Sequence, residues 1–450
     1  MKDFTLAEIA KACNGEYVGD ESLKNTKITS VERDSRQVNN GSLFLAIKGE
    51  RVDGHDFIEK CFAQGAVCAL CEKAPEKATK PCIVVSSTLD AVKKIGRAYR
   101  EKFDIPVIGI SGSVGKTSTK EMLYAVLSQK FKTHKTQGNL NNELGVPLTL
   151  LSMPEDTEAA VIEMGISDFG EMTRLSEMVQ PTICVLTIIG ECHLENLGDR
   201  DGVLKAKTEM FKNARENADF ILNGDDDKLS TVKTVNGKKP VFFGLDAKND
   251  FYAKNIKNSG DGKVLATLCF DNNNIDVEIP AIGTYMVTNA LAAAAAGKLL
   301  GLTDEEIANG VASYKTVGSR ANVINTGKIK IIDDCYNANP TSVRASLDTL
   351  SNLDGRKVAI LGDMKELGSE ELKLHFDTGV YAKSKDIGTV ITVGELAKEL
   401  AKGADGKAFD TIEDAKSEIL KTIKSGDVVL VKASHSMQFE NIVEFLKQNF

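Results

Sequence analysis

The chain has 450 residues, of which 42% are hydrophobic and 27% charged, and its formal net charge at pH 7 is −8. A chain of this length predicts about two to four globular domains, each with its own core. The acidic balance argues against nucleic acid or anionic membranes as general partners. The most apolar stretch, 290–300, is Ala-rich and too short to span a bilayer. We therefore expect a globular protein with no nucleic-acid partner and no membrane insertion.

Residues 1–104 predict a small α+β domain of short strands and amphipathic helices. The first ten residues carry charges every few positions, which is typical of an amphipathic helix and not of a signal peptide. A strand is expected within 41–47 and helices over 57–64 and 89–103. The last helix should lead into the next domain.

The nine cysteines are scattered along the chain, with four of them between positions 61 and 82. Cys68 and Cys71 have Cys-x-x-Cys spacing, but no second such pair completes a zinc site. A metal cluster with Cys61 and Cys82 is one interpretation. Reduced core thiols of a cytoplasmic protein are the favoured one.

A phosphate-binding loop is predicted within residues 106–120, which read PVIGISGSVGKTSTK. A buried strand should precede the loop, and a helix should start at Lys116 and run towards Lys130. The helix start favours an anion, Lys116 offers an ammonium to the terminal phosphates, and the Thr117 hydroxyl can bind Mg²⁺. Ile110 stands where the usual motif has its first glycine, so a turn without a ligand is the alternative. Such a turn has no use for Gly-Lys-Thr.

Strands and helices alternate from residue 107 onward, which predicts a parallel sheet that binds ligands at the carboxyl ends of its strands. The strands of this central unit are expected at 107–110, 159–162, 182–188 and 220–222. A hairpin-like stretch, 241–279, and two helices, 285–300 and 303–313, should follow. A third unit, again α/β, begins near 317, with strands at 329–332, 358–361, 389–393 and 428–431.

Two reactive side chains follow strands of the central unit. Glu163 ends a buried strand, where its carboxylate can bind Mg²⁺ directly or through water, or interact with a helix N-terminus. His193 follows the next strand; a lone histidine is usually structural, but its position beside a magnesium carboxylate makes a ligand role equally plausible. These two residues are therefore candidate metal ligands.

Two loops are rich in side-chain amides. The loop 136–147 could bind a polar substrate, since amides donate and accept, or its Asn and Gly residues simply make turns. The loop 333–340, DDCYNANP, favours a polar pocket over a solvated turn. A helix should begin near Thr341, whose hydroxyl could cap it.

Together these segments resemble the Mur ligase family, ATP-dependent amide ligases of bacterial cell-wall synthesis, over essentially the whole chain. Residues 112–117 match the family's phosphate loop, which explains the missing first glycine. Residues 136–142 with 145–149 match its amide loop, and 34–36, 41–44 and 53–57 resemble its UDP-sugar domain. The segments 333–340 and 361–368 are closest to the branch that adds D-alanyl-D-alanine.

The resemblance implies an α/β protein of three domains. These are a UDP-sugar-binding α+β domain (1–104), a central P-loop mononucleotide-binding domain with a parallel sheet (105–315) and a Rossmann-like domain for dipeptide and nucleotide (316–450). It also implies a monomeric cytoplasmic ligase that joins D-alanyl-D-alanine to UDP-N-acetylmuramoyl-tripeptide, using ATP and two Mg²⁺ ions, through an acyl phosphate.

The resemblance assigns site residues at the matching positions. Implied catalytic residues are Lys116, Glu163, His193 and Lys207. Implied metal ligands are Thr117, Glu163, His193 and Lys207 as a carbamate. Implied nucleotide contacts are Gly112, Ser113, Gly115, Lys116, Thr117, Ser118, Asn289, Arg320 and Asp334. Implied substrate contacts are Ser35, Arg36, Thr136, Asn139, Asn142, Tyr336 and Asn337.

Lys207 has an unusual implied role, and two other positions depart from the family's pattern. A neutral Lys207 amine can take up CO₂ and become an anionic oxygen ligand for Mg²⁺; without the resemblance it would be interpreted as a solvated helix lysine. Tyr285-Met286 stands where the family commonly has His-Asn or His-Met. His435 stands where Arg is usual, and a neutral His cannot replace the bidentate fork of Arg.

Three alternative functions are considered at this point. One is a ligase of the same superfamily that adds an amino acid to another muramoyl peptide or to folate. Another is a P-loop NTPase that uses hydrolysis as a conformational switch on a protein partner. The third, a non-catalytic nucleotide-binding module, is the least favoured because Glu163, His193 and Lys207 occur together.

Overall fold

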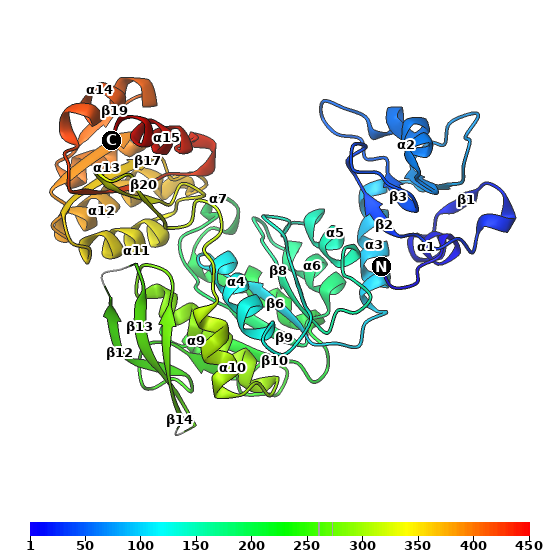
Figure 1. The fold of residues 1–450 in the computed structure, drawn as a ribbon, viewed down its shortest axis with the longest axis horizontal. Coiled ribbons are helices and arrows are strands. Elements are labelled where there is room, and N and C mark those ends of the chain that lie inside the picture. The colour runs from blue at the N-terminus through cyan, green and yellow to red at the C-terminus, as the bar shows by residue number, and fades with distance from the viewer. Residues whose placement is uncertain (260–261, 272) are drawn as a thin grey trace.

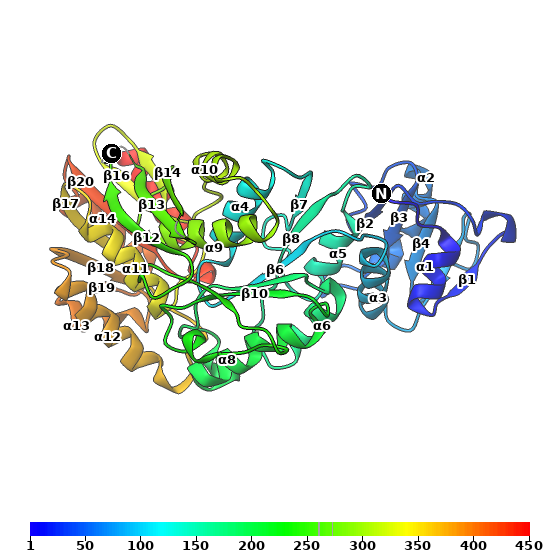
Figure 2. The ribbon, with the colours of Figure 1, turned by 90° about the horizontal axis from the view of Figure 1, so that it is seen from below.

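The computed structural model describes residues 1–259, 262–271 and 273–450, which form three α/β units in a row (Figures 1 and 2). The N-terminal unit (blue) and the C-terminal unit (yellow to red) lie at opposite ends of the central unit. The predicted α/β class with three domains is confirmed. Among the described residues, no helix is long and apolar enough to cross a membrane.

The N-terminal unit is built on a five-stranded sheet with the order β1-β5-β4-β3-β2, in which only the pair β1/β5 is antiparallel. Its strands are β1 (Glu16–Val18), β2 (Ser30–Glu32), β3 (Ser42–Leu45), β4 (Cys68–Cys71) and β5 (Cys82–Val84). Its helices are α1 (Leu6–Cys13), η1 (Glu21–Leu23), η2 (Gly54–Phe57), α2 (Ile58–Gln64) and α3 (Thr88–Arg100). Helix α3 packs against α5 of the central unit. All nine cysteines of the chain are buried and free of disulfides, as expected of core thiols.

The first helix begins later than predicted. Thr5 has an extended backbone, and its side chain accepts a hydrogen bond from Glu8 N, while the Glu8 carboxylate accepts one from Thr5 N. This capping box fixes the helix start at Leu6. The charge spacing of residues 1–10 revealed an amphipathic pattern but not this boundary.

The central unit is built on a six-stranded, wholly parallel sheet with the order β11-β10-β9-β6-β8-β7. Its strands are β6 (Val107–Ser111), β7 (Thr133–Lys135), β8 (Ala159–Glu163), β9 (Ile183–Leu186), β10 (Asp219–Asn223) and β11 (Val241–Phe243). Its helices are α4 (Lys116–Leu127), α5 (Gly145–Leu151), α6 (Glu171–Val179), α7 (Leu194–Leu197), α8 (Arg200–Thr208), η3 (Glu209–Asn213), η4 (Leu229–Thr231), α9 (Tyr285–Leu299) and α10 (Asp304–Ala312). The fully buried alanines of α9 allow it to pack closely against α4.

The stretch predicted as hairpin-like forms the antiparallel sheet β12 (Tyr252–Asn258), β13 (Val264–Phe270) and β14 (Asn273–Ile279). Its first residues instead form β11, which extends the main sheet in parallel. The small sheet shares a hydrophobic core with α4 and α9.

The C-terminal unit has a six-stranded sheet with the order β15-β16-β20-β17-β18-β19, parallel except for the pair β15/β16. Its strands are β15 (Asn322–Asn325), β16 (Lys330–Asp333), β17 (Arg356–Gly362), β18 (Thr389–Val393), β19 (Lys407–Phe409) and β20 (Asp427–Lys432). Its helices are α11 (Pro340–Ser351), η5 (Gly368–Glu370), α12 (Glu371–Ser384), α13 (Ala397–Ala404), α14 (Ile412–Thr422), η6 (His435–Met437) and α15 (Glu440–Asn449).

Candidate active site

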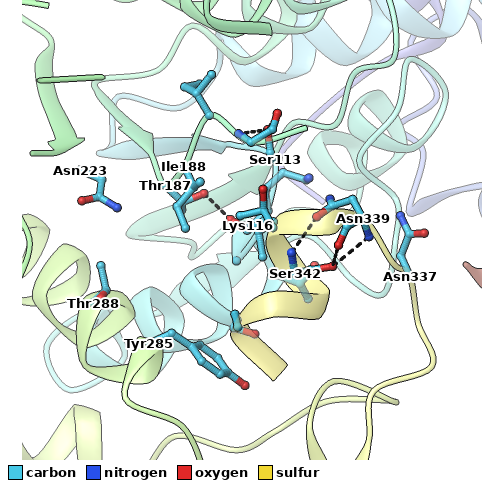
Figure 3. A pocket seen from close by; sticks show the side chains of 18 of the residues that line it. Ser113, Lys116, Thr187, Ile188, Asn223, Tyr285, Thr288, Asn337, Asn339 and Ser342 are labelled. Atoms are coloured by element: carbon cyan, nitrogen blue, oxygen red, sulfur yellow. Dashed lines mark hydrogen bonds between the residues drawn. The ribbon is translucent and has the colours of Figure 1, made fainter. Parts of the chain in front are cut away.

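A cavity of about 840 Å³ lies between the central and C-terminal units. One wall comes from the loops after β6, β8 and β9, and the other from the loop before α11 and from α11 itself. In Figure 3, Asn337, Asn339 and Ser342 lie on one side of Lys116, and Asn223 and Thr288 lie on the other. The predicted site residues that line this cavity are Ser113, Gly115, Lys116, Thr117, Ser118, Asn142, Glu163, His193, Asn289, Arg320, Asp334, Tyr336 and Asn337.

The phosphate loop connects β6 to α4 and is held against the segment that follows β9. Ser113 Oγ accepts a hydrogen bond from Gly190 N (2.9 Å), and Thr187 Oγ1 donates one to Val114 O (2.6 Å). Lys116 Nζ donates to Gly112 O (2.8 Å), so the ammonium lies folded over its own loop. The loop therefore presents the start of α4 to the cavity, as a phosphate cradle requires.

Gly112 occupies a position that no other residue fits. Its φ is +147°, and a Cβ there would overlap Thr187 Oγ1. We expect Gly112→Ala to destabilise the protein by about 1–3 kcal/mol. The variant should also bind nucleotide more weakly, because the loop can accommodate the new Cβ only if it breaks its hydrogen bonds to the segment after β9. Thermal unfolding and ADP titration test this. Gly388→Ala, where nothing lies within 4 Å of the new Cβ, is the matched control and should change neither; unchanged ADP binding in Gly112→Ala would contradict the prediction.

Glu163, at the end of β8, is the centre of a buried polar cluster and is 1% exposed. Thr117 Oγ1 donates to its carboxylate (2.9 and 3.1 Å), and Asn141 Nδ2 donates to Oε1 (2.8 Å). Lys120 Nζ lies 3.7 Å from Glu163 Oε2. Thr136, also buried, accepts a hydrogen bond from Glu163 N (3.0 Å) and does not line the cavity. In this structure Thr136 therefore positions Glu163 and is not placed to contact a substrate.

The donor set at this point fits Mg²⁺. A hydroxyl and a carboxylate offer hard oxygen ligands, and Mg²⁺ usually completes its shell with waters and substrate phosphates. Among the described residues, no three His, Cys, Asp or Glu side chains group together as a metal site. A magnesium ion here would thus depend on the nucleotide for part of its coordination.

His193 lies directly before α7, with a left-handed backbone (φ 52°). Its Nδ1 is 2.5 Å from Glu366 Oε2 of the C-terminal unit, and this contact lowers the pKa of Glu366. In this structure His193 therefore links the two walls of the cavity.

Lys207, on α8, is buried to 1% exposure and does not line the cavity. The solvated interpretation of this lysine is therefore wrong. No carboxylate lies within ion-pair distance of its Nζ in the described part of the chain, and burial lowers its pKa to about 8. Lys116 and Cys192 are among its electrostatic neighbours. A lysine with such a pKa has a larger neutral fraction near neutral pH than an ordinary lysine, and the neutral amine is the form that reacts with CO₂.

The C-terminal wall carries a fixed carboxylate and a stack of planar groups. Asp334 Oδ2 accepts hydrogen bonds from Lys432 Nζ (2.6 Å) and Ser346 Oγ (2.6 Å). The Arg320 guanidinium lies 3.6 Å from the centre of the Tyr336 ring, which stacks in turn on His435 at 5.9 Å. His435 thus meets Tyr336 through its ring face, a contact that does not require the bidentate fork of Arg.

Helix α11 is capped differently from the prediction. The Asn339 side chain accepts from Ser342 N (2.8 Å) and is the N-cap, with Pro340 at the first helical position. Thr341 instead donates its hydroxyl to Glu191 across the cavity (2.5 Å). Thr341 therefore joins the two units.

The remaining predicted residues lie outside the cavity lining. Ser35 and Arg36 belong to the N-terminal unit, where the Arg36 guanidinium binds Asp34 through two nitrogens and lowers the pKa of Asp34 to about 2. Asn139 is exposed in the amide loop. Gly112, like Thr136 and Lys207, contributes to the site from behind the lining.

The sequence reasoning missed three polar residues at this site. Asn141 lies in the amide loop, in which the resemblance assigns only Thr136, Asn139 and Asn142. Lys120 follows Lys116 by four residues, so helical spacing places both on one face of α4. Lys432 ends the last buried strand, and its charge at the end of an apolar run was the available signal.

Three domain families match the chain: "Mur ligase family, catalytic domain" over residues 27–111, "Mur ligase middle domain" over 110–297, and "Mur ligase, glutamate ligase domain" over 319–435. Among similar proteins is the UDP-N-acetylmuramoyl-tripeptide–D-alanyl-D-alanine ligase of Bacillus subtilis, 36% identical, with 98% of each chain covered. The enzyme of that name from Escherichia coli is 34% identical, with 100% of this chain and 99% of the other covered.

Solved structures agree with these matches. A crystal structure of MurF from Acinetobacter baumannii has a TM-score of 0.92 and 32% identity, and covers 100% of this chain and 99% of the other. MurF ligase from Thermotoga maritima in complex with ADP has a TM-score of 0.83 and 30% identity, with 93% and 97% covered. The chain therefore belongs to the Mur ligase family.

Proposed function

We propose that this chain is an ATP-dependent ligase that joins D-alanyl-D-alanine to UDP-N-acetylmuramoyl-tripeptide in peptidoglycan precursor synthesis. The observation that carries the proposal is the cavity itself. It brings together a phosphate loop, the buried Glu163 carboxylate, which suits Mg²⁺, and a polar C-terminal wall. The chain also aligns end to end with ligases of this name.

The first step joins two anions, so the site must neutralise charge. The terminal carboxylate of the tripeptide attacks the γ-phosphorus of ATP, and ADP leaves. The N–H groups at the start of α4 bind phosphate oxygens. The Lys116 ammonium gives up its hydrogen bond to Gly112 O and binds the terminal phosphates of ATP instead. Thr117 and Glu163 would hold a magnesium ion, which would supply further neutralisation of phosphate charge.

The second step forms the amide. The amine of D-alanyl-D-alanine attacks the carbonyl carbon of the acyl phosphate, the tetrahedral intermediate collapses, and inorganic phosphate leaves as the amine loses its proton. Water would hydrolyse the acyl phosphate, so the reaction needs an enclosed site. A cavity between two units, linked by His193–Glu366 and Thr341–Glu191, suits closure over the substrates.

The other assignments belong to the same proposal. A carbamate on Lys207, with Glu163 and His193, would serve a second Mg²⁺. The nucleotide would contact Gly112, Ser113, Gly115, Ser118, Asn289, Arg320 and Asp334. The UDP-sugar and peptide substrates would contact Ser35, Arg36, Asn139, Asn142, Tyr336 and Asn337, while Thr136 would act from behind them by positioning Glu163. We further propose that the domains divide at 104/105 and 315/316 and that the protein is a cytoplasmic monomer.

Phosphate release tests the function directly. The enzyme receives ATP and Mg²⁺ with UDP-N-acetylmuramoyl-tripeptide and D-alanyl-D-alanine, singly and together. Release only with both, with a product heavier by one dipeptide less water, supports the proposal. Release that is independent of both substrates would indicate an NTPase switch. Release with a different carboxylate substrate in place of UDP-N-acetylmuramoyl-tripeptide, or with a different amine in place of D-alanyl-D-alanine, would indicate another ligase of the superfamily.

A further inference from the structure

Arg344 is a cation on the C-terminal wall of the cavity that lacks a firm partner. It lies on α11, lines the cavity and is 32% exposed. Its buried Nε has no hydrogen-bond partner, and the guanidinium donates no hydrogen bond to any described residue. Within the described ranges, the nearest carboxylate is Glu191, at the limiting distance of 4.0 Å. Glu191 already accepts the hydroxyl of Thr341.

Of the other five lining cations, four contact a carboxylate or donate a hydrogen bond, and the fifth, Arg320, lies on an aromatic ring. Arg200 binds Asp227 and donates to Ile189 O (2.8 Å). Lys432 is buried against Asp334. Lys116 donates a hydrogen bond to its own loop, His193 contacts Glu366, and Arg320 lies on the Tyr336 ring. Arg320 and Arg344 are therefore the two lining guanidiniums that donate no hydrogen bond to a described residue, and Arg320 already lies 3.6 Å from the centre of the Tyr336 ring, which leaves Arg344 as the candidate to take an anion from the cavity.

The surroundings of Arg344 hold its side chain without neutralising it. Asp348, one helical turn further along α11, is engaged by Lys385 (2.7 Å) and by the hydroxyl of Tyr381 (2.8 Å). The Tyr381 ring lies 5.9 Å from the guanidinium carbon, within the range of a cation–π contact. The result is a supported guanidinium with free donors.

The acceptor dipeptide supplies an anion of matching chemistry. Its amine must reach the acyl phosphate beside the phosphate loop, while its free carboxylate lies at the other end, up to about 7 Å away in an extended dipeptide. A carboxylate that leaves water needs a paired cation, and the Arg fork binds carboxylates bidentately. We propose that Arg344 binds the free carboxylate of the acceptor dipeptide and so selects an acceptor with a free C-terminus. This inference rests on the proposed function and adds a recognition residue to it.

A double replacement, on the protein and on the ligand, tests the pairing. Wild type and Arg344→Ala are assayed for phosphate release with D-alanyl-D-alanine and with D-alanyl-D-alaninamide, which keeps the amine but lacks the carboxylate charge. We expect Arg344→Ala to raise the KM for the dipeptide on the order of 100-fold and to leave the KM for ATP and for the UDP-tripeptide unchanged. The amide should be a poor acceptor for the wild type, and the variant should no longer distinguish it from the acid.

Two further variants make the result specific. Arg344→Lys keeps the charge but not the fork, so its KM should lie between those of wild type and Arg344→Ala. Lys373→Ala removes one cation from α12, outside the cavity lining, and should behave as wild type. ADP binding and thermal unfolding of each variant show that the fold is retained.

The contrary outcomes are distinct. Equal losses with the acid and the amide would overturn the proposal, because the effect would not depend on the carboxylate. A selective rise in the KM for ATP or for the UDP-tripeptide would assign Arg344 to that substrate instead. A wild-type enzyme that ligates neither acceptor would refute the proposed function itself, and this inference with it.

Discussion

Replacement of Lys116 by alanine is expected to lower ligase turnover by at least about 1,000-fold while the protein stays folded. The loss follows from charge: phosphoryl transfer to a carboxylate brings two anions together, and Lys116 is the cation at the start of α4. The fold should survive because the Lys116 side chain is only partly buried and makes one hydrogen bond, to Gly112 O. Phosphate release with both substrates, together with thermal unfolding, measures the two effects separately.

The matched control for this variant is Lys132→Ala. Lys132 lies beyond the end of α4, its side chain is 66% exposed, and it forms a surface ion pair with Asp156. The Lys132→Ala variant loses one positive charge from the central unit, as Lys116→Ala does, but should keep wild-type turnover. Wild-type turnover in Lys116→Ala would refute the phosphate role of the loop.

The strands of the parallel sheets could be predicted because each is a short apolar run between turn residues. The strand at 389–393 matches the prediction at both ends, and the other predicted sheet strands agree to within a few residues. The start of α1 could not be predicted from apolar spacing, because a capping box sets it. The sequence offers Thr341 as a possible cap of α11, but the observed cap is Asn339, because both residue types can cap and Thr341 is drawn into the tertiary contact with Glu191.

The candidate site was predictable where one segment carries the chemistry, as in the phosphate loop. It was not predictable where contacts join distant segments. The pairing of Arg320 with Tyr336, of Lys432 with Asp334, and of His193 with Glu366 depends on how the C-terminal unit meets the central one. The burial of Lys207 likewise depends on tertiary packing, since a lysine in a helix is ordinarily expected to be solvated.

Replacement of Lys207 by methionine is expected to abolish ligation and also to stabilise the fold at neutral pH. A carbamate that serves as a metal ligand cannot form on methionine, so turnover should fall by at least about 100-fold. The unmodified lysine, in contrast, has no carboxylate partner among the described residues, and its burial is unfavourable to the charged form. Methionine of similar length removes this penalty, and the free energy of unfolding at pH 7 should rise by about 1–3 kcal/mol.

The pH dependence of stability separates this explanation from better packing. The folded pKa of Lys207 is about 8, below the ordinary value of 10.5 that applies to the unfolded chain. Between these values the unfolded state binds more protons, so the lysine's penalty is full below pH 8 and fades as pH rises towards 10.5. Denaturant unfolding of both proteins in CO₂-free buffer should therefore give a difference that is largest near pH 7 and falls through this window. A difference independent of pH would mean that methionine merely packs better, and an active Lys207→Met enzyme would exclude a catalytic carbamate.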